Sequence, residues 1–187
     1  MSALTGGFAD PPVAAAEAFR AVLDAMARPG RIAEVAGAAP PPPLSTAAGV
    51  VALTLLDRET PVWLSPALAA SDLPEWLAFH TGAPVVAEKG AAMFGLGAWE
   101  TLAPLSDWAQ GTAEYPDRSA TLIVEMPELS AAGARLTGPG IAESATLSVP
   151  DPAALTANRA AFPLGVDLIL TAGARLAALP RTVRVEG

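Results

Sequence analysis

FPLGVDLILT, residues 162–171, is the stretch of sequence that decides the fold class. Apart from Asp167 it has the composition of a buried β-strand, rich in branched apolar side chains. A second apolar run, RLAALP at 175–180, follows after Thr-Ala-Gly-Ala, which predicts a β-hairpin with a short loop. In that hairpin Asp167 lies opposite a residue near Leu179, and Arg181 comes within diagonal reach of it.

Asp167 is the exception in this stretch, because burying an unpaired carboxylate costs several kcal/mol. Three interpretations remain open: a structural ion pair with Arg181, a place in a functional pocket, or an edge position that faces water. If the pair exists, Asp167→Asn leaves an arginine without its partner and lowers stability.

Helices are predicted from apolar spacing, capping residues and breakers. In the first of them, Phe19, Val22, Leu23 and Met26 share one face, which we expect to pack on the protein. The predicted helices are one from Pro12 to Arg28, one capped by Ser45, one with a capping box of Asp72 and Glu75 that ends at Gly82, a broken helix at 98–110 interrupted at Pro104, and one at 151–160 capped by Asp151.

Strands are predicted where short apolar runs lie between turn-forming residues. Besides the final hairpin they fall at 31–35, 60–65, 84–87, 91–97, 120–126, 134–137 and 145–149. Strands therefore outnumber crossover helices, and several neighbours are hairpins. The expected class is α/β, with a mixed sheet covered by helices in a single domain over residues 1–187.

Composition excludes several functions. The net charge of −8 argues against nucleic-acid binding, and the absence of cysteine together with a single histidine argues against a metal site. No long apolar run could span a membrane, and the start, MSALTGGFADPP, lacks the features of a signal peptide, so we expect a cytoplasmic protein. Charged residues make up only 16% of the chain, which favours a homodimer with an apolar contact surface.

Motifs for cofactor binding are incomplete. Gly95-Leu96-Gly97 and Gly138-Pro139-Gly140 begin like dinucleotide loops, but glutamate occupies the third glycine position in both. Lys89 is the only lysine and therefore the only possible Schiff base; its setting, Glu-Lys-Gly, is typical of an exposed turn. The chain is therefore expected to use no cofactor.

Three further residues are candidates for a site. His80 ends a predicted helix, where it either bonds to carbonyl groups or acts in catalysis. Arg118 and Ser119 precede a buried strand and either grip an anion or pair with neighbouring acids. An independent enzyme would require His80, Asp167 and Arg181 to converge on one pocket.

The sequence also resembles the PhnH family of the bacterial carbon–phosphorus lyase system. The similarity runs from Phe19 to Glu186 and is weakest at 35–43. It is carried by FRAVLDAMARPGRI, TPVWLS, FHTGAP, GTAEYPDRSATLIVE, RLTGPGIAE and FPLGVDLILTAGARLAALPRT, in that order. The positions that match are His80, Thr81, Ser119, Gly138, Gly140, Asp167 and Arg181, which are candidates for shared structure first; no catalytic residue is implied.

The resemblance implies a three-layer αβα sandwich, similar to the large domain of transferases that use pyridoxal phosphate but without that cofactor. It implies a subunit in phosphonate catabolism that supports formation of α-D-ribose 1-alkylphosphonate 5-triphosphate from a nucleoside triphosphate and an alkylphosphonate. The implied partners are PhnG, PhnI and PhnJ subunits. The alternatives are the independent enzyme and, from the fold alone, a pyridoxal phosphate enzyme.

Overall fold

The hairpin predicted from the opening stretch lies at the centre of the structure, a computed structural model that describes residues 5–187. Strand β7 (Asp167–Ala172) runs antiparallel to β8 (Arg175–Leu179), with Leu168 opposite Leu179 as the sequence predicts. The loop is shorter than predicted, because strand pairing continues up to Arg175. Gly173 makes this tight turn possible by adopting a φ of 59°, a backbone angle that residues other than glycine rarely adopt.

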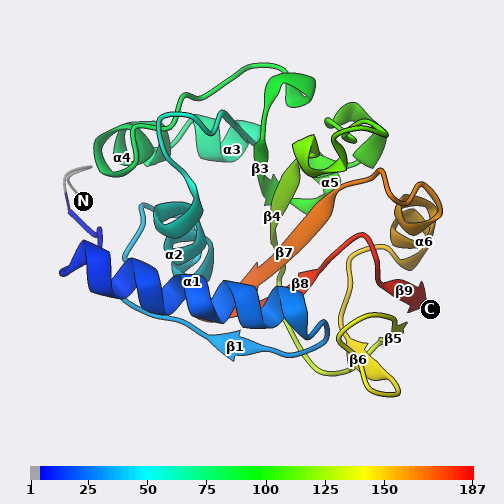
Figure 1. Ribbon diagram of the computed structural model, residues 1–187. Helices are drawn as coiled ribbons and strands as arrows, with labels where there is room; N and C mark the ends of the chain where they lie inside the picture. Colours follow the sequence, from blue (N-terminus) through cyan, green and yellow to red (C-terminus); the bar gives the residue numbers. More distant parts are fainter. Residues whose placement is uncertain (1–4) are drawn as a thin grey trace.

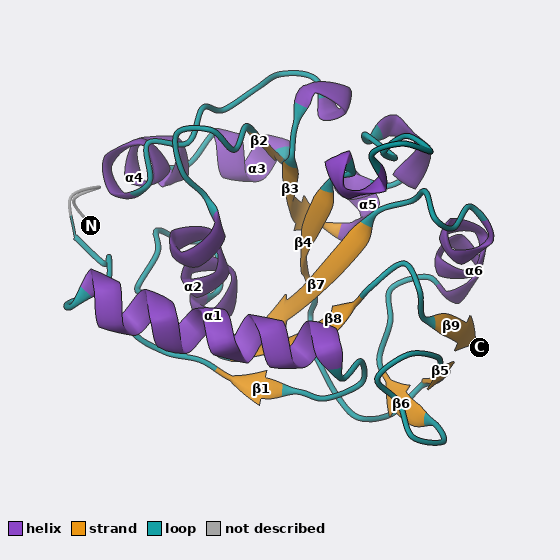
Figure 2. Cartoon of the chain, in the orientation of Figure 1, coloured by secondary structure: helices purple, strands orange, loops and turns teal. Residues whose placement is uncertain are grey.

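A six-stranded sheet is built around this hairpin in the order β1-β8-β7-β4-β3-β2. Strands β2, β3, β4 and β7 are parallel, whereas β8 and β1 are antiparallel to their neighbours. The sheet is therefore mixed, as expected (Figure 2). Its remaining strands are β1 (Ala33–Glu34), β2 (Val62–Leu64), β3 (Phe94–Ala98) and β4 (Thr121–Glu125).

Layers of structure cover both faces of the sheet. On one face α1 and α2 pack together against the hairpin, and α4 packs on α2 (Figure 1). On the other lie α5, α6 and a small antiparallel sheet, β6-β5-β9, so this layer is part helix and part strand, unlike a uniform αβα sandwich. The elements are α1 (Pro11–Ala27), α2 (Thr46–Leu55), α3 (Pro66–Ala69), α4 (Leu73–His80), α5 (Trp99–Leu102), α6 (Pro152–Ala160), β5 (Ala134–Thr137), β6 (Ala145–Leu147) and β9 (Arg184–Glu186).

Two of the three predicted helix caps form. The Ser45 side chain accepts a hydrogen bond from the Ala48 amide at the start of α2, and Asp151 does the same for α6. The capping box at Asp72 was a wrong prediction, because that side chain makes no capping bond. Ser71 replaces it at α4, where its hydroxyl accepts a bond from the Leu73 amide.

The predicted inner face of α1 is partly wrong. Its fully buried residues are Ala18, Val22 and Ala25, whereas Phe19 and Leu23 are 49% and 55% exposed. Small side chains allow α1 to approach α2 and β8 closely, so the alanine stripe faces inward instead of the bulkier stripe beside it. The result is an apolar strip on the outer surface of α1.

The strand predicted at 84–87 does not form. Only a single bridge joins Val85 to Val62, because the chain then turns into a short 3-10 segment, Lys89–Ala91. The predicted break of the helix at Pro104 is confirmed, with a 3-10 turn at Leu105–Asp107 after α5. The short elements α3 and β9 have no counterpart in the predictions.

Lys89 is not the exposed turn lysine that its sequence setting indicates. Its side chain is only 17% exposed, and Nζ donates hydrogen bonds to the carbonyl oxygens of Leu102 and Ala103 at 3.3 and 3.1 Å. The ammonium group also lies 5.3 Å from the Trp63 ring centre. The amine therefore links the 3-10 segment that contains Lys89 to the end of α5.

No helix within residues 5–187 is long and apolar enough to cross a membrane. Residues 1–4, part of the opening segment from which a cytoplasmic protein is predicted, lie outside the described residues.

Candidate functional site

Asp167 and Arg181 form the ion pair that the hairpin register predicts, at the amino ends of the parallel strands. The Arg181 backbone amide and Nε both donate to Asp167 Oδ1, at 2.8 and 3.1 Å, and Nη2 donates to Oδ2 at 2.6 Å. The two side chains are only 18% and 12% exposed. Of the three interpretations of Asp167, the structural pair is therefore confirmed.

The guanidinium group of Arg181 is fully occupied by protein acceptors. Nη1 donates to the carbonyl oxygens of Pro116 and Pro163, and Nη2 donates to the Ser119 hydroxyl as well as to Asp167. An arginine side chain has five N–H donors, so none remains for a ligand. Arg181 thus joins three loops that are far apart in sequence.

The pair also lines a shallow hollow of about 370 Å³ at the surface. Phe162 and Pro116 border the same hollow. The guanidinium group of Arg118, a candidate anion-binding group, stacks on Tyr115, with its carbon 4.2 Å from the ring centre. Of the two residues predicted to hold an anion, only Ser119 joins the Arg181 cluster, and its partner there is a cation.

Gly138 and Gly140 shape the turn between β5 and β6. Both have positive φ values, 135° and 81°. A Cβ atom on Gly140 would come 2.0 Å from the Ala27 carbonyl oxygen, and one on Gly138 would come 3.2 Å from that of Thr182. These glycines therefore allow close backbone contacts with Thr182 and Ala27.

His80 and Thr81 lie at the end of α4, on the side of the molecule away from the start of β7 (Figure 1). The His80 ring packs against Trp76 and Phe79, with ring centres 5.0 and 4.9 Å away, and its buried Nε2 has no hydrogen-bond partner among residues 5–187. The Thr81 hydroxyl donates to the Leu77 carbonyl oxygen and ends the helix. The structure does not bring His80 to Asp167 and Arg181, as the independent-enzyme alternative requires.

Glu125 is the titratable residue that the sequence reasoning missed. It ends β4 at the carboxyl edge of the parallel strands, where α/β proteins commonly bind their ligands. Its Oε1 accepts a 2.8 Å hydrogen bond from the Ser45 amide, and the Ser45 and Thr171 side chains also act to lower its pKa. Burial raises the pKa of Glu125, and these hydrogen bonds offset only part of that effect. Its sequence signal is a carboxylate directly after the buried run Leu-Ile-Val.

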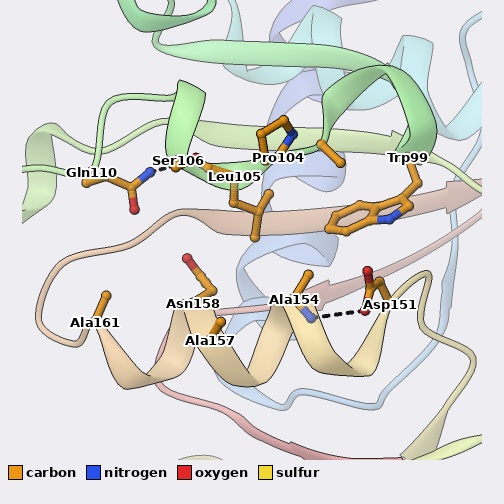
Figure 3. A pocket seen from close by; sticks show the side chains of 11 residues that line it. Trp99, Pro104, Leu105, Ser106, Gln110, Asp151, Ala154, Ala157, Asn158 and Ala161 are labelled. Carbon is orange, nitrogen blue, oxygen red and sulfur yellow. Dashed lines mark hydrogen bonds between the residues drawn. The ribbon is translucent and has the colours of Figure 1, made fainter.

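Two hollows lie on either side of Trp99, just past the carboxyl end of β3. One, of about 480 Å³, is bordered by Glu100, Glu125 and Met126. The other, of about 390 Å³, lies between α6 and the segment that contains Pro104 (Figure 3). Trp99 borders both, which makes this edge of the sheet the best candidate for a ligand site.

No group of three or more histidine and acidic side chains within residues 5–187 is arranged to hold a metal ion. The fold and its site thus define a mixed-sheet α/β protein with a structural arginine cluster at the amino ends of its strands and two hollows that share Trp99 at their carboxyl ends.

Comparison with known proteins assigns this α/β protein to a family. Residues 6–186 match the family model described as bacterial phosphonate metabolism protein (PhnH). The chain is 46% identical over 190 residues to "Alpha-D-ribose 1-methylphosphonate 5-triphosphate synthase subunit PhnH" of Rhizobium meliloti (strain 1021), covering 97% of this chain and 95% of the relative. The chain belongs to the PhnH family.

A second relative is more distant. "Putative C-P lyase subunit protein HtxG" of Stutzerimonas stutzeri is 33% identical over 177 residues, which cover 90% of this chain and 84% of that protein. Both relatives carry names of subunits. The resemblance found from the sequence motifs is therefore confirmed at the level of the family.

Proposed function

We propose that this chain is the PhnH-type subunit of an α-D-ribose 1-methylphosphonate 5-triphosphate synthase in bacterial phosphonate catabolism. The observation that carries the proposal is the match to the R. meliloti subunit over almost the full length of both chains. In the proposed reaction an alkylphosphonate displaces the base of a nucleoside triphosphate. The partners are PhnG, PhnI and PhnJ subunits, and the complex works in the cytoplasm.

The role within that complex is accessory to catalysis. The fully occupied guanidinium of Arg181 supports this role, since it has no donor left for a phosphate. The separation of His80 from the Asp167 pair supports it too, because the two do not share a pocket. Neither position offers the nucleophile and base in mutual contact that an independent active site needs.

The chain forms one cofactor-free domain, similar to the large domain of transferases that use pyridoxal phosphate. The position of Lys89 supports function without this cofactor. A Schiff base would have to form on an amine whose hydrogens are donated to two backbone carbonyls and which is mostly buried.

The homodimer contact in this proposal uses the outer strip of α1. Val13, Phe19 and Leu23 are 54%, 49% and 55% exposed on this one helix, and large apolar side chains grouped in this way mark contact surfaces. Phe19→Ser combined with Leu23→Ser should convert a dimer to a monomer in light scattering. Phe79→Ser, which removes an equally exposed ring from α4, is the matched control.

Co-expression with the three partner subunits tests the proposed function. The chain should co-purify in one assembly, and that assembly should convert a nucleoside triphosphate and methylphosphonate to the ribose 1-phosphonate product, followed by phosphorus NMR. Omission of this chain should reduce product formation. A chain that stays separate from all three subunits, or an assembly equally active without it, contradicts the proposal.

A further inference from the structure

Trp99 is the one tryptophan without a partner among residues 5–187. Trp63 and Trp108 pack edge to face with ring centres 5.6 Å apart, and the Trp108 indole N–H donates to the Leu102 carbonyl oxygen. Trp76 packs on the ring of His80 and donates to a backbone carbonyl. Trp99 makes no such ring contact or hydrogen bond in this part of the chain, and its half-buried side chain packs against the core between the sheet and α6. Its ring and its N–H donor are available to a ligand.

The groove on the α6 side of Trp99 has the shape of a small-molecule site. Figure 3 shows the indole projecting between α6 and the segment that follows α5. One wall consists of the small side chains of Ala154 and Ala157 on α6 and of Ala161 just after its end, and the other includes Pro104. The volume of about 390 Å³ lies within the range of ligand sites, roughly 300–1,000 Å³. A flat ring can therefore stack beside Trp99.

Besides the Trp99 N–H, the Ser106 hydroxyl and the Asn158 amide, the groove offers two free hydrogen-bond acceptors, on Asp151 and Gln110. Asp151 uses Oδ1 to cap α6, which leaves Oδ2 available. Gln110 donates both of its amide bonds to the carbonyl oxygens of Leu105 and Trp108, which leaves Oε1 as an acceptor. No lysine or arginine among residues 5–187 lines the groove. A ligand with N–H donors is favoured here, and a phosphate or carboxylate is repelled.

The chemistry of the adjoining hollow is consistent with this preference. Glu100 and Glu125 border it, and it too lacks a basic lining residue. The net charge of −8 adds a repulsive field for anions over the whole molecule.

We propose that the groove beside Trp99 binds a planar nitrogen heterocycle that carries N–H or amino donors and no anionic group, such as a free purine base. The ring stacks on the indole, and its donors bond to Asp151 Oδ2 and Gln110 Oε1. Stacking of a base on an aromatic side chain contributes about 1–3 kcal/mol, which corresponds to about a fivefold to 150-fold gain in affinity. This site goes beyond the proposed subunit role and does not depend on assembly with partners.

Adenine titrated into the purified full-length chain by calorimetry is the first test. Wild-type protein should bind it with 1:1 stoichiometry, and Trp99→Ala should weaken binding at least about fivefold. Ala157→Leu fills the groove from α6 and should weaken binding equally. Ala153→Leu is the matched control, because this alanine is exposed on the same helix and does not line the groove.

The anionic arm of the test uses adenosine 5′-monophosphate. It should bind at least about tenfold more weakly than adenine, because no cation is present to receive its phosphate. Adenine that fails to bind at millimolar concentration overturns the proposal. So does adenine that binds equally well to the wild type, Trp99→Ala and Ala157→Leu, or monophosphate that binds as tightly as the free base.

Discussion

Removal of the Asp167–Arg181 pair should cost more stability than any exposed ion pair of the chain. Asp167→Asn keeps an oxygen that can accept from the Arg181 amide but removes the charge that balances the guanidinium group. A hydrogen bond to a charged group contributes about 1.5–3 kcal/mol, so we expect Asp167→Asn to cost about 2 kcal/mol. For a domain of this size that corresponds to a fall in melting temperature of roughly 4–8 °C.

Arg181→Met should cost more, about 3–4 kcal/mol. It removes the bonds to two backbone carbonyls and Ser119, and it leaves the Asp167 carboxylate mostly buried with only an amide donor. The double variant Asp167→Asn/Arg181→Met should then be less destabilised than the sum of the single variants. The difference, the coupling energy of the pair, should be about 1–2 kcal/mol.

Urea denaturation of the four proteins in this cycle measures these values. Arg135 and Glu186 supply the control, since they form a 2.9 Å ion pair whose side chains are 54% and 58% exposed. Glu186→Gln should change the free energy of unfolding by less than about 1 kcal/mol. If Asp167→Asn changes it no more than the control does, the cluster is not a structural anchor and the reasoning fails.

Two further predictions concern the carboxyl edge and the core. Burial raises the Glu125 pKa, so the folded state should lose stability as the pH rises from about the ordinary pKa of 4.5 to the raised pKa. Glu125→Gln should abolish this loss, whereas Glu128→Gln at an exposed position should not. Urea titrations at a series of pH values measure both effects. Gly95→Ala should destabilise the fold by about 1–3 kcal/mol, because the new Cβ atom would lie 2.1 Å from the Trp108 ring. In thermal melts Gly90→Ala should be nearly neutral, since its Cβ atom would meet nothing closer than 3.6 Å.

The central hairpin was predictable because its signals are local. Two continuous apolar runs, a glycine-containing loop between them and an arginine just past the second strand together indicate the register, and the register places Arg181 beside Asp167. The cap at Ser45 is equally local, since it needs only the hydroxyl and the amide three residues on. Features of this kind depend on neighbours in the sequence and little on the rest of the fold.

Long-range packing explains the features that the sequence did not reveal. In α1 two stripes have helical spacing, and the bulkier one, with Phe19 and Leu23, looked like the core face. The alanine stripe faces inward because α2 and β8 pack closely against it. The sequence of α1 alone does not indicate this packing. Likewise Lys89 is mostly buried because α5 ends beside it and offers two carbonyls.

The position of the candidate site shows the same division between local and long-range signals. Unusual residues in buried runs, such as Asp167, attract notice in a sequence, but here the unusual residue lies at the amino end of its strand and its charge is balanced within the fold. Glu125 is the last residue of β4 and Trp99 directly follows β3, and only the parallel pairing of these two strands places them at one edge. Since that edge is where ligands of α/β sheets bind, the orientation of the strands is a better guide to the site than the rarity of a residue.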